Sequence, residues 1–292
     1  DKAAKLLGKE AGLFVSSGTQ SNLCATLAHC HRGDEIIVGD SYHIFRDEAG
    51  GAAVLGGVMM APVSTTASGG MLPDDIAATV KPDDAHCAIS RLLCLENTVA
   101  GHVQSAETIN ELAAVGRTHG LAVHLDGARL MNAAVKLGIP AAKLVAGVDT
   151  VSLCLSKGLG TPAGSVLVGP ADFIRRAHRM RKLVGGGMRQ IGVLAAAGIH
   201  ALDHHVDRLA DDHRNALHLA ERLQQVKAIN VDPDLVHTNM VFIGLPDGAA
   251  DGLRKYLAEQ GILLGGGSKQ IRLVTHLDIT RDDVDLLGEE IS

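Results

Sequence analysis

Residues 152–169 read Ser152-Leu-Cys-Leu-Ser-Lys157-Gly-Leu-Gly-Thr-Pro-Ala-Gly164-Ser165-Val-Leu-Val-Gly169. Two short apolar runs, at 151–155 and 165–168, predict strands, and the glycines and proline between them predict a hairpin loop. The loop carries a single lysine, Lys157. A lysine that burial removes from water offers a free amine, which can form a Schiff base with an aldehyde. A solvated loop lysine is the ordinary alternative, and the sequence upstream has to decide between the two.

An apolar strand upstream, at 121–126, ends on Asp126 and is followed by a helical pattern. A carboxylate at the carboxyl end of a strand lies where α/β sheets bind ligands. Its alternative role is to cap the helix that follows. Together, Lys157 and Asp126 predict a pyridoxal phosphate site. The lysine would bond the aldehyde, and the carboxylate would favour the protonated pyridine ring, which withdraws electrons.

A set of short motifs resembles the threonine aldolases, which are fold-type I pyridoxal-phosphate lyases. In the family's order, over nearly the whole chain, the motifs are Ser17-Gly18-Thr19, Leu95-Glu-Asn-Thr98, His124-Leu-Asp126-Gly-Ala-Arg129, Ser156-Lys157-Gly158, Gly185-Gly-Gly-Met-Arg189-Gln and Ile271-Arg272-Leu-Val-Thr-His276. The resemblance implies retro-aldol cleavage of threonine or allo-threonine to glycine and acetaldehyde. It leaves open a phenylserine-type aldolase, a β-eliminating lyase or a racemase on the same fold. A non-catalytic binding module is a further alternative, against which the intact Lys157 and Asp126 weigh.

The resemblance also implies which residues hold the cofactor phosphate. Gly18 and Thr19 would bind it at a helix N-terminus, which is a natural anion site, although a hydroxyl cap without a ligand is the commoner case. Arg189 would approach the same phosphate, with Lys182 as a further candidate, across a subunit interface.

By the same resemblance, His43 would stack on the cofactor ring, and His86 would be a second active-site histidine. Either could take the proton of the β-hydroxyl group, because an imidazole pKa near ~6.5 suits neutral conditions. A purely structural role is the alternative for each histidine. Asp47 stands where many relatives carry an aromatic residue, which leaves the shape of the aldehyde pocket open.

The resemblance further implies that two arginines bind the substrate carboxylate, because a guanidinium group can donate two parallel hydrogen bonds to a carboxylate. Arg129 follows Asp126 by three residues, and Arg272 interrupts an apolar strand. A guanidinium buried there needs a partner, so a salt bridge to a nearby aspartate is the other explanation for Arg272.

Strand and helix patterns alternate along most of the chain, which predicts an α/β fold with a mostly parallel, doubly wound sheet. We place a large cofactor-binding domain at residues 1–205 and a smaller α+β domain at 206–292. A long helical region that opens at 185–190 and extends to about Val226 would join them. The family normally carries some tens of residues ahead of the position of Asp1, so we expect an N-terminal segment to be missing and turnover to be reduced.

Composition limits the partners of the 292-residue chain. Its net charge of −6 without a basic run argues against nucleic acid. No apolar stretch approaches the ~20 residues that a membrane-spanning helix needs. The cysteines are odd in number (five) and lack a CxxC pair, which favours buried thiols in a reducing compartment. Composition and the resemblance together lead us to expect a cytoplasmic homo-oligomer, a dimer or a tetramer, that binds a small amino acid and no metal, membrane or nucleic acid.

Overall fold

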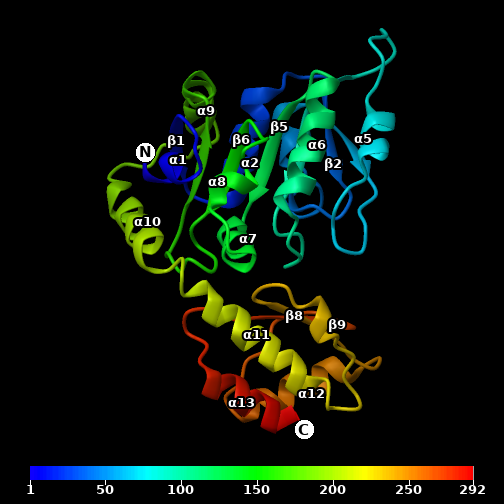
Figure 1. The fold of residues 1–292 in the computed structure, drawn as a ribbon, viewed down its shortest axis with the longest axis vertical. Coiled ribbons are helices and arrows are strands. Elements are labelled where there is room, and N and C mark those ends of the chain that lie inside the picture. Colours follow the sequence, from blue (N-terminus) through cyan, green and yellow to red (C-terminus); the bar gives the residue numbers. More distant parts are fainter. Residues whose placement is uncertain (292) are drawn as a thin grey trace. The chain divides into compact units, whose positions relative to one another are not determined.

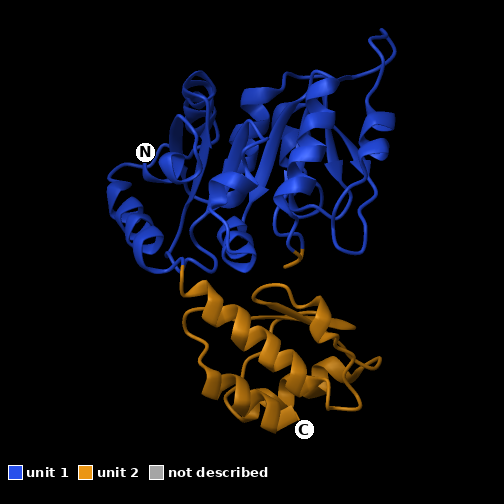
Figure 2. Cartoon of the chain, viewed as in Figure 1, with its two compact units in different colours: residues 1–99, 103–206 blue, residues 100–102, 207–292 orange. Residues whose placement is uncertain are grey.

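The chain divides into two compact units in the computed structural model, which describes residues 1–291. Unit 1 comprises residues 1–99 and 103–206, and unit 2 comprises residues 100–102 and 207–292 (Figure 2). The chain forms two sheets, a seven-stranded one in unit 1 and a two-stranded one in unit 2.

The sheet of unit 1 has the strand order β1-β7-β6-β5-β4-β2-β3 (Figure 1). Its strands are β1 (Ala11–Val15), β2 (Asp34–Gly39), β3 (Met59–Val63), β4 (Ile89–Glu96), β5 (Ala122–Gly127), β6 (Thr150–Cys154) and β7 (Ser165–Gly169). Only β7 runs against the others, because it pairs antiparallel with both β1 and β6. The remaining pairs are parallel. The predicted α/β fold with a mostly parallel sheet is confirmed.

Helices cover both faces of this sheet (Figure 1). The helices of unit 1 are α1 (Lys2–Leu6), α2 (Gly18–His29), α3 (His43–Arg46), α4 (Gly51–Gly56), α5 (Pro73–Thr79), α6 (Ala106–Thr118), α7 (Leu130–Leu137), α8 (Ala141–Leu144), α9 (Ala171–Leu183) and α10 (Gly192–His204). Because side chains alternate along a strand, Asp126 of β5 points to one face and Val123 to the other. Helices α2 and α9 pack on the first face, and α6 approaches Val123 on the second.

The carboxyl ends of β1, β2, β4, β5 and β6 meet at one edge of the sheet, because these strands run in the same direction. The segments that follow these strands therefore lie close together, although they are far apart in sequence. Ligands of open α/β sheets bind at this edge.

Strands β6 and β7 form the predicted hairpin around Lys157. Within its loop, the N–H of Leu155 donates to the carbonyl of Gly164 at 3.0 Å. Gly164 has a φ of 109°, and a Cβ atom there would overlap the ring of Phe14. Only glycine suits both conditions, so this residue fixes the shape of the loop that presents the lysine.

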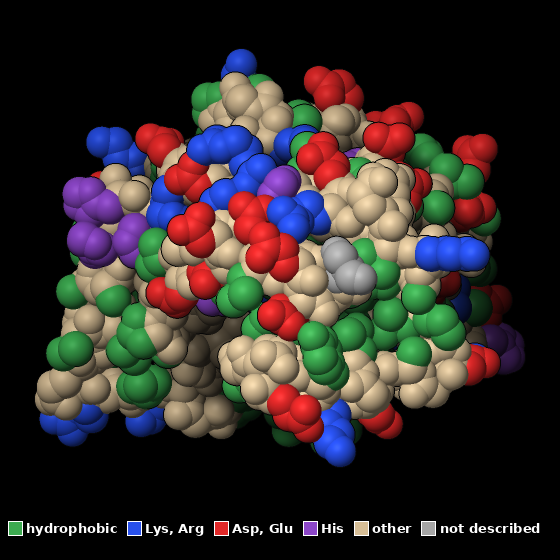
Figure 3. Space-filling view, turned by 90° about the horizontal axis from the view of Figure 1, so that it is seen from below, with side chains coloured by type: hydrophobic (Ala, Val, Ile, Leu, Met, Phe, Trp, Pro, Cys, Tyr) green, Lys and Arg blue, Asp and Glu red, His purple; other side chains and the backbone are tan. Residues whose placement is uncertain are grey.

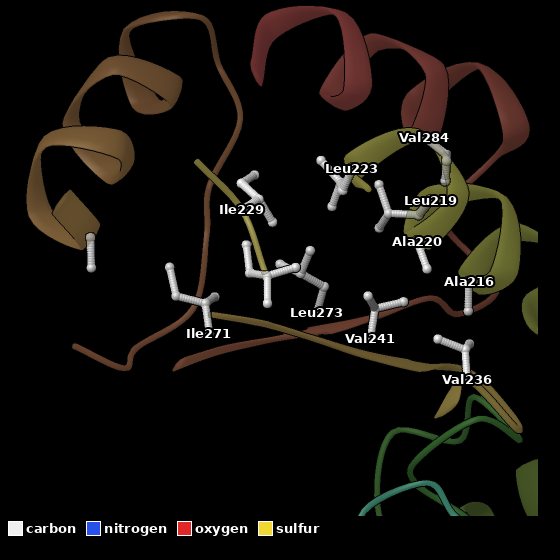
Figure 4. Packing of buried hydrophobic residues seen from close by; sticks show 12 residues of the cluster. Ala216, Leu219, Ala220, Leu223, Ile229, Val236, Val241, Ile271, Leu273 and Val284 are labelled. Atoms are coloured by element: carbon white, nitrogen blue, oxygen red, sulfur yellow. The ribbon is translucent and has the colours of Figure 1, made fainter. Parts of the chain in front are cut away.

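Unit 2 is built around an antiparallel pair, β8 (Met240–Gly244) and β9 (Gln270–Val274). Its helices are α11 (Leu209–Leu223), the short 3₁₀ helix η1 (Pro233–Leu235), α12 (Ala249–Glu259) and α13 (Arg281–Ile291). An apolar cluster between the strands and the helices forms its core (Figure 4). A capping box precedes α13, because Thr280 N–H donates to Asp283 at 2.8 Å and Asp283 N–H donates to Thr280 Oγ1 at 3.2 Å.

The helical region predicted from 185–190 to about Val226 consists of two helices separated by a break. Helix α10 ends at His204, and α11 begins at Leu209. The Nδ1–H of His205 donates to the carbonyl of Leu159 at 2.7 Å, which ties the end of α10 to the hairpin loop of unit 1. The break contains neither glycine nor proline, so the sequence carries no signal for it.

The surface mixes both signs of charge. On the face shown in Figure 3, acidic and basic side chains are interspersed with apolar ones. Among residues 1–291, no helix is both long and apolar enough to cross a bilayer. All the cysteines are free thiols, and all but Cys87 are buried, as predicted.

Candidate active site

The carboxylate of Asp126 is buried at the end of β5, with 3% of the residue exposed. Its Oδ1 accepts the backbone N–H of Ala128 at 2.9 Å, and its Oδ2 accepts Nδ2 of Asn22 at 2.7 Å. Helix α7 begins later, with Arg129 in the cap position. The alternative role of Asp126 as a helix cap is therefore excluded.

Lys157 lies half-buried in the hairpin loop after β6, the strand beside β5. Its positive charge acts on both His43 and Glu96, lowering the pKa of each. Asp126 acts on the same two groups and raises their pKa values. The structure thus brings the predicted lysine, aspartate and first histidine to one edge of the sheet.

His43 begins α3, after the end of β2, and is half-buried. Its Nδ1 lies 2.9 Å from Oε1 of Glu48, and its backbone N–H donates to Oε2 of Glu96 at 2.7 Å. The hydrogen bond to Glu48 has the largest effect and raises the pKa of His43, while burial opposes it. Asp47, which stands where many relatives carry an aromatic residue, is exposed and immediately precedes Glu48.

Asn22, Glu48 and Glu96 complete the site, and the sequence did not predict them. Glu96 ends β4 and pairs with Asp126 across the strands, so the strand-end signal that indicated Asp126 also applies to it. Burial, followed by the charge of Asp126, raises the pKa of Glu96 to about 8. Burial also raises the pKa of Glu48. Asn22 and Glu48 carry no local signal, because only the packing of α2 and of the segment after α3 brings them to the sheet.

The ligand atoms of His43, Glu48 and Asp126 lie within 4.8 Å of one another, close enough to hold a metal ion. However, Nδ2 of Asn22 donates to both carboxylates from the same space. An N–H donor that occupies these oxygens disfavours a cation between them. The chemistry of the donors therefore favours an organic ligand.

The N-terminus of α2 presents free backbone donors near this edge. Ser17 caps the helix, because its Oγ accepts the N–H of Gln20 at 3.1 Å. The N–H groups of Gly18 and Thr19 have no acceptor among residues 1–291. Two free amides at the start of a 12-residue helix can bind an anion.

Arg189 and Lys182 are both exposed. Lys182 lies in the last turn of α9, and Arg189 lies between α9 and α10. Gly186 of the same segment lies so close to Gln20 that a Cβ atom would overlap its side chain. The segment that carries Arg189 therefore passes beside the N-terminus of α2.

The structure does not bring His86 to this site. It precedes β4, whereas Glu96 ends that strand, and eight residues of strand span about 26 Å. Its side chain is 94% exposed and lies 2.7 Å from Asp84. Of the two predicted histidines, only His43 lies at the site within one chain. The catalytic role of His86 remains a prediction that this geometry does not favour.

The two arginines differ in their surroundings. Arg129 is half-buried directly after β5, in unit 1. Arg272 lies on β9 of unit 2, where Ile271 and Leu273 are buried and Arg272 is exposed. The inference that Arg272 is buried is therefore wrong, because its apolar neighbours point to the opposite side of the strand.

Arg272 also lacks the salt bridge that was its alternative explanation, since none of its nitrogen atoms pairs with a carboxylate within residues 1–291. Instead it lines a cavity of about 550 Å³ in unit 2, together with His276 and Asp278.

Comparison with known proteins agrees with this geometry. A family model described as beta-eliminating lyase matches residues 1–245, and the chain belongs to this family of lyases. It is 47% identical to the low specificity L-threonine aldolase of Escherichia coli (strain K12), over 97% of this chain and 84% of that protein. It is 46% identical to the low-specificity L-threonine aldolase 1 of Arabidopsis thaliana, over 97% of this chain and 82% of that protein.

A solved structure shares the fold. The threonine aldolase of Leishmania major is 22% identical and superposes with a TM-score of 0.81, covering 99% of this chain and 86% of that chain. The resemblance to the threonine aldolases, and the fold-type I architecture that it implied, are confirmed.

Proposed function

We propose that the protein is a pyridoxal-phosphate-dependent aldolase that cleaves threonine or allo-threonine between Cα and Cβ, giving glycine and acetaldehyde. The observation that carries the proposal is the convergence of Lys157, Asp126 and His43 at one sheet edge, in a chain 47% identical to a low specificity L-threonine aldolase. We assign the cofactor-binding domain to residues 1–205 and the smaller domain to 206–292.

The donor set fits pyridoxal phosphate. Lys157 supplies an amine for the aldehyde. Asp126, fixed by two N–H donors, supplies a carboxylate for the pyridine nitrogen. The free amides of Gly18 and Thr19 suit the phosphate, with Arg189 nearby. When bound, the cofactor supplies an electron sink for the negative charge that bond cleavage leaves on Cα.

His43 is the group that takes the proton of the β-hydroxyl. Its Nδ1 faces Glu48, which leaves Nε2 to act as the base. A base must be unprotonated, so kcat/KM should rise as the pH passes upward through the pKa of His43. Arg129, half-buried beside the strand end, would bind the carboxylate, whereas the same role for Arg272 remains a prediction.

The substitution Lys157→Ala tests this proposal. The purified protein should show a visible absorbance band that borohydride abolishes, with the reduced cofactor attached to Lys157 on peptide mapping. The variant should lose the borohydride-sensitive band and more than about 100-fold of its activity, because the covalent attachment is gone. Lys143→Ala removes an exposed lysine of α8 and should change neither property. A band that survives in Lys157→Ala contradicts the assignment.

Product analysis separates the aldolase from its alternatives. Threonine should yield glycine and acetaldehyde in equal amounts. Ammonia and 2-oxobutyrate as main products would place the protein among the eliminating lyases instead, and an unreactive protein would favour the binding module. A panel of β-hydroxy amino acids that includes phenylserine would define the pocket.

We also propose a homo-oligomer, a dimer or a tetramer, in the cytoplasm. Apolar side chains are exposed on and near α9 and α10, with Leu183 72%, Val193 78% and Ile199 51% exposed. Exposed apolar side chains of this kind are typical of surfaces that become buried against another protein chain, which supports an oligomer. The free cysteines support a reducing compartment. Light scattering on the purified protein would measure the oligomeric state, and a monomer would contradict it.

A further inference from the structure

A row of buried and partly buried polar side chains lies between α2 and the sheet, and the reaction proposed above uses only its end. The row is formed, in order, by His29, Thr150, His124 and Asn22, and then divides to Asp126 and Glu48. His124 and Asn22 are at most 1% exposed. Buried polar groups are costly unless each finds a partner, so the direction of every bond in the row matters.

Asn22 fixes the direction of the row. Its Nδ2 lies 2.7 Å from Oδ2 of Asp126 and 2.8 Å from Oε1 of Glu48. Both partners are carboxyl oxygens, so the amide nitrogen donates one hydrogen to each. The amide oxygen therefore points the other way, toward Nε2 of His124 at 3.1 Å, and accepts a hydrogen bond.

The histidine side of the row follows from this orientation. Nε2 of His124 must carry a hydrogen, and burial, which lowers the pKa of His124 to about 3, keeps the ring neutral. Its Nδ1 then accepts from the hydroxyl of Thr150 at 2.9 Å. That hydroxyl oxygen in turn accepts from Nε2 of His29 at 2.9 Å. Each group thus donates in one direction only.

The other branch reaches the base. Oε1 of Glu48 accepts from Asn22 and also lies 2.9 Å from Nδ1 of His43. A carboxyl oxygen that already accepts the amide makes Nδ1 the donor, so the lone pair of neutral His43 is on Nε2. An imidazole in solution has no such contact, and its hydrogen is distributed between both ring nitrogens.

We propose that Asn22 and Glu48 are positioning residues: Asn22 holds the two buried carboxylates side by side, and Glu48 fixes the His43 tautomer that leaves Nε2 free as a base. The meaning of the tautomer for catalysis rests on the proposed function. The arrangement of hydrogens depends only on the chain and can be measured without cofactor or substrate.

The charges around His43 agree with this role. Glu48 and Asp126 raise its pKa, whereas burial and the charge of Lys157 lower it. Glu96 faces it through the backbone N–H. Glu48→Ala should therefore move the His43 titration to lower pH, because the hydrogen bond to Glu48, which has the largest effect in raising the pKa of His43, is lost.

Nuclear magnetic resonance of the histidine rings tests the proposal. Two-bond ¹H–¹⁵N spectra of cofactor-free protein with ¹⁵N-labelled histidine report which ring nitrogen carries hydrogen, and His43→Gln and His124→Asn assign the signals. The unchanged protein should show the Nδ1–H form of His43 and the Nε2–H form of His124. In Glu48→Ala, which removes the oxygen that accepts from Nδ1, the Nε2–H form of His43 should become populated. In Asn22→Ala the Nε2 signal of His124 should shift, because its acceptor is gone.

The neighbouring exposed carboxylate provides a matched control. Asp47→Asn removes the same charge one residue away and should leave the tautomer of His43 unchanged. The Nε2–H form of His43 in the unchanged protein, or an unaltered tautomer in Glu48→Ala, would overturn the proposal. The tautomer of His43 in the unchanged protein tests the proposal even if a variant fails to fold. Circular dichroism would show such a failure.

The pH profile gives a second measurement. Relative to the unchanged enzyme, Glu48→Ala should lower kcat/KM at least about tenfold and move its rising limb to lower pH. Asp47→Asn should not move that limb. A protein with the expected tautomers and no aldolase activity would refute the proposed function and leave the positioning of His43 intact.

Discussion

At the scale of single residues, burial keeps two histidines uncharged, His29 at the end of α2 and His124 on β5. It lowers the pKa of His124 to about 3 and that of His29 to about 4, with the charge of Arg176 adding to the effect on His29. In the unfolded chain both would titrate near ~6.5. Below that pH the unfolded chain binds protons that the folded chain cannot, so acid favours unfolding.

We therefore expect the free energy of unfolding to fall as the pH decreases from about 6.5 to 4. The slope should reach about 1.4 kcal/mol per pH unit for each of the two histidines. Urea unfolding at several pH values and constant ionic strength would measure it. His124→Asn should reduce the slope, whereas His119→Asn, at an exposed position after α6, should not. Equal slopes in the two variants would contradict the explanation.

Some residues of the candidate site could be predicted from the sequence and others could not, for a physical reason. Asp126 and Lys157 follow apolar strands, so their position at the binding edge could be predicted from the pattern alone. Asn22 and Glu48 reach that edge only through the packing of a helix and a loop. Arg272 shows the opposite error, because a strand buried on one side still exposes every second side chain.

At the scale of elements, the hairpin of β6 and β7 was predictable because two apolar runs flank a loop rich in glycine. The break between α10 and α11 was not, since it depends on a tertiary bond from His205 to the carbonyl of Leu159. Local composition predicts elements well where turn residues mark their ends. It fails where a contact distant in sequence ends a helix.

The hairpin also supplies a test of how firmly Lys157 is held. Gly164→Ala should destabilise the protein by about 2–4 kcal/mol, because φ is 109° there and the new methyl group would overlap Phe14. Gly138→Ala is the matched control, with a φ of 64° and open space around it, and should cost about 1 kcal/mol. Thermal unfolding would compare the two, and similar losses would show that the Phe14 contact contributes little.

At the scale of the whole molecule, the chain is two units, each with a buried core of its own. The core of unit 2 includes Leu219 of α11, which is 3% exposed, together with Val241, Leu273 and Val284 (Figure 4). Truncation of a buried leucine removes apolar contacts and leaves a cavity. The loss should act first on the unit that contains it.

Leu219→Ala should destabilise unit 2 by about 2–5 kcal/mol and accelerate hydrogen exchange in β8 and β9 more than in β4 and β5. Leu217→Ala, on the same helix but 39% exposed, should have little effect. Hydrogen exchange followed by mass spectrometry would resolve the two sheets. An equal acceleration in both sheets would show that the units open together.

The row of hydrogen bonds under α2 has a consequence for protein engineering. Since Thr150 and His124 each donate to one neighbour and accept from the other, and Asn22 accepts from one neighbour and donates to two, a substitution at one position leaves a mismatched hydrogen at the next. The effects of substitutions at His29, Thr150, His124 and Asn22 should therefore be strongly non-additive, and a harmful change at one position could be compensated by a second change beside it. Libraries that aim to alter the aldehyde accepted by this site should vary these four positions jointly or leave them untouched.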